Sequence, residues 1–154
     1  MKRFTDLIAE ILPEITEVFP WDVEELHEQK PGLLLLDTRE PYEFDQMRIA
    51  GSINAPRGIL ETACDWGYDE TIPELAAARE RPVLVVCRSG NRSALAAHVM
   101  QQMGYQDVAS LKTGLRGWTD YELPLVDAEG KEVDIDAAEA FFTPKVTPEQ
   151  MPPK

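Results

Sequence analysis

The segment Pro82–Cys87 limits the possible folds more than any other part of the sequence. It is apolar throughout, rich in β-branched valine, and has the length of a strand that is buried on both faces. A polar turn at residues 88–91 follows it, and the sequence then predicts a helix over residues 92–103 that ends at Gly104. A buried strand that leads through a tight turn into a helix is typical of a parallel α/β sheet.

Other apolar segments repeat this alternation of strand and helix. Short apolar runs bounded by turn residues predict further strands at 33–36, 53–55 and 108–111. Helices are predicted at 22–28, 40–46, 74–80 and from residue 114 onward, and an irregular segment at 57–70. Two of these helices are expected to begin with capping boxes, formed by Asp22 with Glu25 and by Thr71 with Glu74. The alternation predicts an α/β fold with a parallel sheet.

The two ends of the chain differ from this pattern. Residues 1–16 contain an apolar stripe at helical spacing, formed by Phe4, Leu7, Ile8 and Ile11, which predicts a short amphipathic helix. Residues 127–154 are acidic and contain several prolines, so we expect a partly ordered extension, with Phe141 and Phe142 attaching it to the body. We therefore divide the chain into an N-terminal helix (1–16), one domain (17–126) and a C-terminal extension (127–154).

Composition narrows the possible partners. The formal net charge of −13 argues against binding to nucleic acids or to anionic membranes, and it favours a solvated surface or a basic partner protein. The two cysteines, Cys64 and Cys87, provide neither a disulfide framework nor the spacing of a zinc site. Neither a signal peptide nor a membrane-spanning run is evident. We expect a cytoplasmic protein without a metal or other cofactor, and the sequence leaves its oligomeric state open.

Cys87 is the candidate nucleophile. It lies at the carboxyl end of the predicted strand, where amide groups of the following turn can form an anion-binding nest and the next helix begins with a partial positive charge. Arg88 and Arg92 add two cations, and Gly90 permits a tight turn. A thiol in these surroundings is expected to form a reactive thiolate. The alternative is a core cysteine, but a core strand does not require this polar turn.

Three motifs occur in series along the chain. They are Leu36–Arg39 with Glu43–Phe44 and Ile49–Pro56, then Cys87–Ser93, and finally Gly114–Trp118 with Leu123–Pro124. Together they resemble the signature segments of rhodanese-like sulfurtransferases over residues 21–126. Two positions depart from the family pattern. Met47-Arg48 stands where Gly-His is frequent, and Thr113-Gly114 replaces a double glycine.

The resemblance implies a five-stranded parallel sheet flanked by helices on both faces, and a thiosulfate sulfurtransferase type of reaction. Cys87 would take the outer sulfur of a small anionic donor such as thiosulfate, become a persulfide, and pass the sulfur to a thiophilic acceptor. The implied binding residues for the donor sulfur are Arg88, Ser89, Gly90, Asn91 and Arg92, and the supporting polar cluster is Asp37, Arg39 and Glu43. Ser93 is expected to cap the following helix. The sequence leaves open whether Cys64 is a resolving thiol or an incidental one.

Two alternative functions remain. A persulfide carrier that serves a dedicated acceptor protein would use the same chemistry at Cys87, and its terminal segments would dock the partner. A phosphatase or arsenate reductase shares the nucleophilic cysteine, but phosphatases of this fold place five residues between cysteine and arginine. Four residues separate Cys87 from Arg92 here. The shorter loop suits one sulfur atom better than a tetrahedral phosphate.

Overall fold

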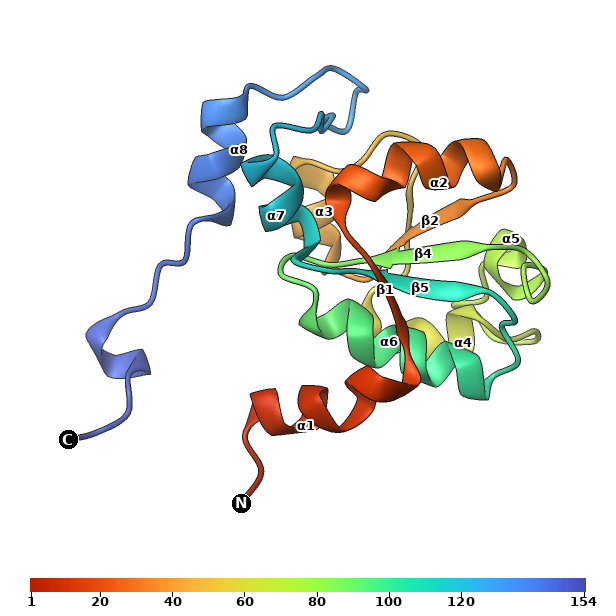
Figure 1. Ribbon diagram of the computed structural model, residues 1–154, viewed down its shortest axis with the longest axis horizontal. Helices are drawn as coiled ribbons and strands as arrows, with labels where there is room; N and C mark the ends of the chain where they lie inside the picture. The colour runs from red at the N-terminus through yellow and green to blue at the C-terminus, as the bar shows by residue number, and fades with distance from the viewer.

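The computed structural model describes residues 1–154 and contains a five-stranded sheet with helices on both faces (Figure 1). The strands are β1 (Thr16–Val18), β2 (Leu34–Asp37), β3 (Ile53–Asn54), β4 (Val83–Val86) and β5 (Val108–Leu111). They lie in the order β1-β5-β4-β2-β3, and every neighbouring pair is parallel. The predicted α/β fold with a parallel sheet is confirmed.

Eight α-helices and four short 3₁₀ segments connect and cover the strands. The α-helices are α1 (Phe4–Ile11), α2 (Val23–Gln29), α3 (Pro41–Gln46), α4 (Leu60–Ala63), α5 (Pro73–Ala76), α6 (Asn91–Gln102), α7 (Gly114–Asp120) and α8 (Ile135–Phe142). The 3₁₀ segments are η1 (Leu12–Glu14), η2 (Pro20–Asp22), η3 (Arg57–Ile59) and η4 (Pro148–Gln150). None of the helices is long and apolar enough to cross a membrane.

The two central strands bury both of their faces, which explains their uninterrupted apolar sequences. Successive side chains of a strand point to opposite faces. Leu34, Leu36, Val83 and Val85 pack with α4, α5 and α6 on one face, whereas Leu35, Leu84 and Val86 pack with α2, α7 and α8 on the other. A polar residue at any of these positions would lie in one core or the other.

The edge strand β1 is the element that the sequence patterns missed. Its three residues are at most half-buried, and they pair with β5 from Thr16 opposite Ala109 to Val18 opposite Leu111. A three-residue edge strand with a central glutamate has no apolar periodicity to reveal it. β1 extends across the proposed boundary at residue 16, and the division of the chain into three segments stays a prediction.

Local details differ from the sequence-based expectations in the capping boxes, in the length of α5 and in residues 57–70. Neither predicted capping box forms, because the Asp22 side chain makes no capping hydrogen bond and the Thr71 hydroxyl donates to the Asp65 carbonyl instead. The helix α5 is also shorter than the predicted segment 74–80. Residues 57–70 are not irregular throughout, because they begin with η3 and α4.

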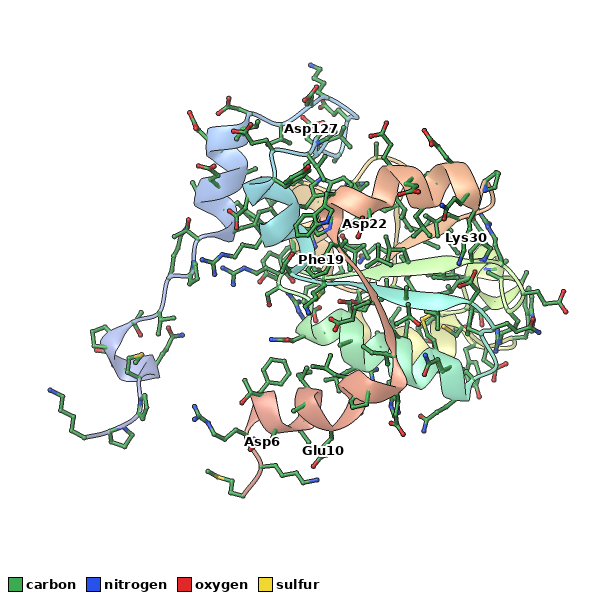
Figure 2. All side chains as sticks on the ribbon, in the orientation of Figure 1. Asp6, Glu10, Phe19, Asp22, Lys30 and Asp127 are labelled. Carbon is green, nitrogen blue, oxygen red and sulfur yellow. The ribbon has the colours of Figure 1, made fainter.

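The two ends of the chain pack against opposite faces of the domain. The helix α1 packs on α6 through Ile8, and its acidic residues Asp6 and Glu10 lie at the edge of the molecule (Figure 2). The helix α8 packs on α7, and beyond it the chain runs away from the body as far as residue 154 (Figure 1). Phe142 is 1% exposed and belongs to the core of that face, so it attaches the C-terminal extension as predicted.

Phe142→Ala is expected to lower the free energy of unfolding by about 3–5 kcal/mol, because it removes a buried aromatic ring from the core. Urea unfolding followed by circular dichroism measures the change. Phe4→Ala is the matched control: Phe4 is 51% exposed, and its loss should change stability by no more than about 0.5 kcal/mol. Equal effects of the two substitutions would show that α8 does not dock on the domain.

Candidate active site

Cys87 follows β4 directly, and its sulfur lies at the centre of the turn that leads into α6. The amides of Gly90 and Ser93 donate hydrogen bonds to Sγ at 3.1 Å and 3.3 Å, and the Ser93 hydroxyl lies 3.3 Å from it. Cys87 is fully buried. The thiol donates to the Ser93 hydroxyl, whereas the two amides point their N–H groups at Sγ and can stabilise negative charge that develops there. We call residues 87–92 the cysteine loop.

The loop adopts this shape because α7 holds it from outside. The amide of Leu115 donates to the Cys87 carbonyl and the amide of Arg116 to the Arg88 carbonyl, each at 2.9 Å. Gly114 makes this approach possible, since a Cβ there would lie 2.6 Å from the carbonyl oxygens of Cys87 and Arg88. The first amides of any helix have no acceptor within that helix. In α7, the loop carbonyls accept hydrogen bonds from two of them.

Three residues at the loop and at the start of α7 have left-handed backbone conformations: Gly90, Thr113 and Gly114, the last with φ 60°. Gly90 has φ 95° and immediately precedes α6, where a glycine fits without strain. Thr113, which precedes α7, has φ 68°. For a β-branched residue this conformation costs about 1–2 kcal/mol. Thr113 therefore adopts the conformation that a glycine would adopt without strain, and the backbone at this position is strained.

Asp37 and Arg39 form a buried ion pair beside the loop. Both side chains are almost fully buried, with Arg39 Nη2 2.9 Å from Asp37 Oδ2 and Nε bonded to the same carboxylate. Arg39 also donates to the Met47 carbonyl at 2.6 Å. These contacts join the end of β2 to α3 and the segment that follows it. The pair bonds to its own surroundings, as expected of a supporting cluster, and its role in the reaction stays a prediction.

Glu43 and Arg92 connect α3 to the cysteine loop. Both guanidinium Nη atoms of Arg92 donate to the Glu43 carboxylate, at 2.9 Å and 3.1 Å. Burial alone would raise the pKa of Glu43, but the hydrogen bonds from Arg92 and from the Glu40 amide, with the charges of Arg92 and Arg39, lower it overall. The bond to Glu43 raises the pKa of Arg92. The structure thus directs the Arg92 guanidinium to Glu43.

The remaining loop residues face outward to different extents. Arg88 is half-buried, and its Nη2 donates to the Phe142 carbonyl at 3.0 Å, while Ser89 is exposed and Asn91 is partly buried. Ser93 does not cap α6, contrary to expectation. It is fully buried, and its hydroxyl lies 2.8 Å from that of Ser110 as well as near the sulfur. Sequence reasoning missed this contact because it treated the serine as a helix terminus.

Two further titratable groups, Cys64 and His98, have structural surroundings. Cys64 is fully buried in the core, and burial raises the pKa of its thiol, which does not favour a role as a resolving cysteine. His98 lies on α6 and forms a 2.9 Å contact with Glu14, next to α1. This position agrees with a histidine on a helix face and not with a general base.

Glu43→Gln is expected to lower the free energy of unfolding at neutral pH by about 2 kcal/mol, since Arg92 loses its charged partner. The pKa of Glu43 is lowered in the folded state from an ordinary value of 4.5, so its contribution is present above that pH and is lost as the pH falls through the folded-state pKa. The stability difference between wild type and variant should therefore shrink in acid. Urea unfolding over a pH series measures it.

Asp45→Asn on the same helix is the matched control. The Asp45 side chain is 72% exposed, and its nearest cation is 3.9 Å away, so the substitution should change stability by no more than about 0.5 kcal/mol. A difference for Glu43→Gln that grows as the pH falls would contradict the assigned direction of the Glu43 shift.

Comparisons with known proteins agree with this geometry. The model of the rhodanese-like domain matches residues 21–121. The sulfurtransferase of Allochromatium vinosum is 33% identical over 98 residues, which cover 64% of this chain and 82% of that protein. The adenylyltransferase and sulfurtransferase MOCS3 of Drosophila virilis is 35% identical over 88 residues, which cover 56% of this chain but only 19% of the fly protein. These relatives support a role in sulfur transfer.

A solved structure adds a similarity of overall shape. A protein of unknown function from Rhodopseudomonas palustris, described as a possible tyrosine phosphatase, has a TM-score of 0.70 at 28% identity, covering 80% of this chain and 94% of that one. The family match extends over both the cysteine loop and the Asp37–Arg39 pair. The chain belongs to the rhodanese-like domain family.

Proposed function

We propose that the chain is a sulfurtransferase that carries sulfane sulfur as a persulfide on Cys87. The thiolate attacks the outer sulfur of a small anionic donor such as thiosulfate, the sulfur–sulfur bond of the donor breaks, and sulfite leaves with the electron pair. A thiophilic acceptor then attacks the outer sulfur of the persulfide and restores the thiolate. The observation that carries the proposal is the convergence of two amides and a hydroxyl on Cys87 Sγ.

The loop supplies what each step needs. Amide groups that are already oriented stabilise negative charge on sulfur without further reorganisation, both in the thiolate and in the persulfide. Arg88 has five N–H donors and uses one within the chain, so others remain for the donor anion. The net charge of −13 does not prevent this attraction, because salt screens distant charges beyond about 8 Å.

The burial of Cys87 bears on how the donor reaches it. The cysteine exposes no surface, so the side chains that cover the loop must shift before the outer sulfur of a donor can approach. Ser89 is exposed, and Arg88 is tied to the rest of the chain by one side-chain hydrogen bond.

A phosphatase reaction is disfavoured by the surroundings of Arg92. Phosphatase chemistry needs a guanidinium that clamps phosphate, whereas both Nη atoms of Arg92 are bonded to Glu43. The four residues between Cys87 and Arg92 also make a smaller loop. A persulfide carrier that serves one acceptor protein would share the chemistry at Cys87, and only the acceptor would distinguish it from an enzyme acting on small molecules.

Cys87→Ser is expected to abolish sulfur uptake. After incubation with thiosulfate, intact-protein mass spectrometry should show wild type heavier by one sulfur atom, reversibly with reductant, and the variant unchanged. Cys64→Ser is the matched control and should still take up sulfur, because Cys64 lies in the core. The proposal would be overturned if Cys64→Ser lost sulfur uptake while Cys87→Ser kept it, or if wild type took up no sulfur from thiosulfate or polysulfide.

Ser93→Ala is expected to slow persulfide formation by about tenfold, the kinetic equivalent of one charge-assisted hydrogen bond of about 1.5 kcal/mol. Quenched-flow mass spectrometry with thiosulfate measures the rate. Ser110→Ala removes the partner of Ser93 but no contact to the sulfur, and both serines are fully buried. A loss of rate as large in Ser110→Ala would assign the effect to packing and not to the contact with Sγ.

A further inference from the structure

A pocket of about 420 Å³ lies beside the cysteine loop, between α3 and the segment that follows α8. Its lining residues are Tyr42, Glu43, Arg88, Phe141, Thr143 and Lys145. Pockets that hold small organic molecules have volumes of roughly 300–1,000 Å³, so this one has far more room than thiosulfate needs. Half of its lining comes from the C-terminal extension, outside residues 21–121 that match the family.

The extension is held against the loop by specific contacts. The Phe142 carbonyl accepts the 3.0 Å hydrogen bond from Arg88, and the Phe142 ring lies 5.9 Å from the buried Arg39 guanidinium. α8 itself packs on α7, whose first amides bond to the loop carbonyls. These contacts hold the end of α8 beside the loop, and Phe141, Thr143 and Lys145 next to it line the pocket.

The pocket is locally cationic in an acidic protein. Arg88 and Lys145 line it, and neither forms an ion pair within the chain. The only acid in the lining, Glu43, is neutralised by Arg92. Two aromatic residues complete the walls, Tyr42, which is 69% exposed, and Phe141. An occupant with negative charge and an organic body matches these walls.

We propose that the C-terminal extension completes a binding site for an organic, carboxylate-bearing thiol compound, which delivers sulfur to Cys87 as its persulfide. Lys145 and Arg88 bind the anionic groups of this donor, and its organic part lies between Tyr42 and Phe141. Lys145 is therefore the residue that favours organic donors over thiosulfate. The inference rests on the proposed sulfur transfer through Cys87.

The reaction with such a donor balances without any further reactant. The Cys87 thiolate attacks the outer sulfur of the organic persulfide, a new sulfur–sulfur bond forms on the protein, and the sulfur–sulfur bond of the donor breaks. The organic thiolate leaves with the electron pair. Its carboxylates stay near Lys145 until it dissociates, and a cationic pocket stabilises the extra negative charge that the leaving thiolate carries.

The experiment compares two donors, glutathione persulfide and thiosulfate, with cyanide as the common acceptor. Lys145→Gln is expected to raise the KM for glutathione persulfide, relative to that for thiosulfate, by roughly fivefold, the loss expected for one partly exposed charge contact. Tyr42→Ala should shift the same ratio in the same direction. Both side chains are exposed, so the variants should keep the thermal stability of the wild type.

Matched controls lie elsewhere on the surface. Lys131→Gln removes an exposed lysine of the same extension, and Tyr68→Ala removes an exposed tyrosine outside the pocket lining. Both should leave the KM ratio unchanged. An unchanged ratio in Lys145→Gln, or an equal rise of KM for both donors, would overturn the assignment of the pocket.

Failure of this inference can be told apart from failure of the proposed function. If Cys87 takes up sulfur from thiosulfate but the KM ratio is insensitive to Lys145 and Tyr42, only the pocket is wrongly assigned. If Cys87 takes up no sulfur from either donor, sulfur transfer itself is excluded, and the pocket assignment is overturned with it.

Discussion

The structure depends on the contact between the cysteine loop and the start of α7. The carbonyls of Cys87 and Arg88 point outward and accept hydrogen bonds from the amides of Leu115 and Arg116. With those carbonyls held outside, the amides of Gly90 and Ser93 point inward to the sulfur. The same contact satisfies the free amides of α7, and it requires a glycine at position 114. One interface thus determines the loop shape, the helix terminus and the direction of the donors to Cys87.

The elements that sequence reasoning predicted are those with a strong physical signal. The leucines of β2 and all four residues of β4 are apolar because both faces of these inner strands are buried. The edge strand β1 carries no such pattern, since its register depends on pairing with β5. The capping-box predictions were wrong because a polar side chain can bond to other nearby groups. The Thr71 hydroxyl, for example, donates to the Asp65 carbonyl. Tertiary contacts decide such cases.

In the candidate site too, features set by neighbouring residues could be predicted and features set by tertiary contacts could not. The candidate nucleophile and its loop form a recognisable pattern in the sequence because Cys87, Gly90 and the arginines are close together along the chain. The partners of those residues are distant in sequence: Glu43 for Arg92, Ser110 for Ser93 and Phe142 for Arg88. Which arginine is free for an anion depends on these partners. The fold commits Arg92 to Glu43 and leaves most of the Arg88 donors available.

The C-terminal extension links stability to chemistry through one residue. Phe142 fills the core between α7 and α8 with its ring, while its carbonyl holds Arg88 of the cysteine loop. The ring also lies near Arg39, whose ion pair with Asp37 joins β2 to α3. Any change that loosens α8 therefore affects both Arg88 in the loop and the buried Arg39. A segment with the composition of an acidic tail thus contacts the cysteine loop through Phe142, because burial of that ring holds α8 against the domain.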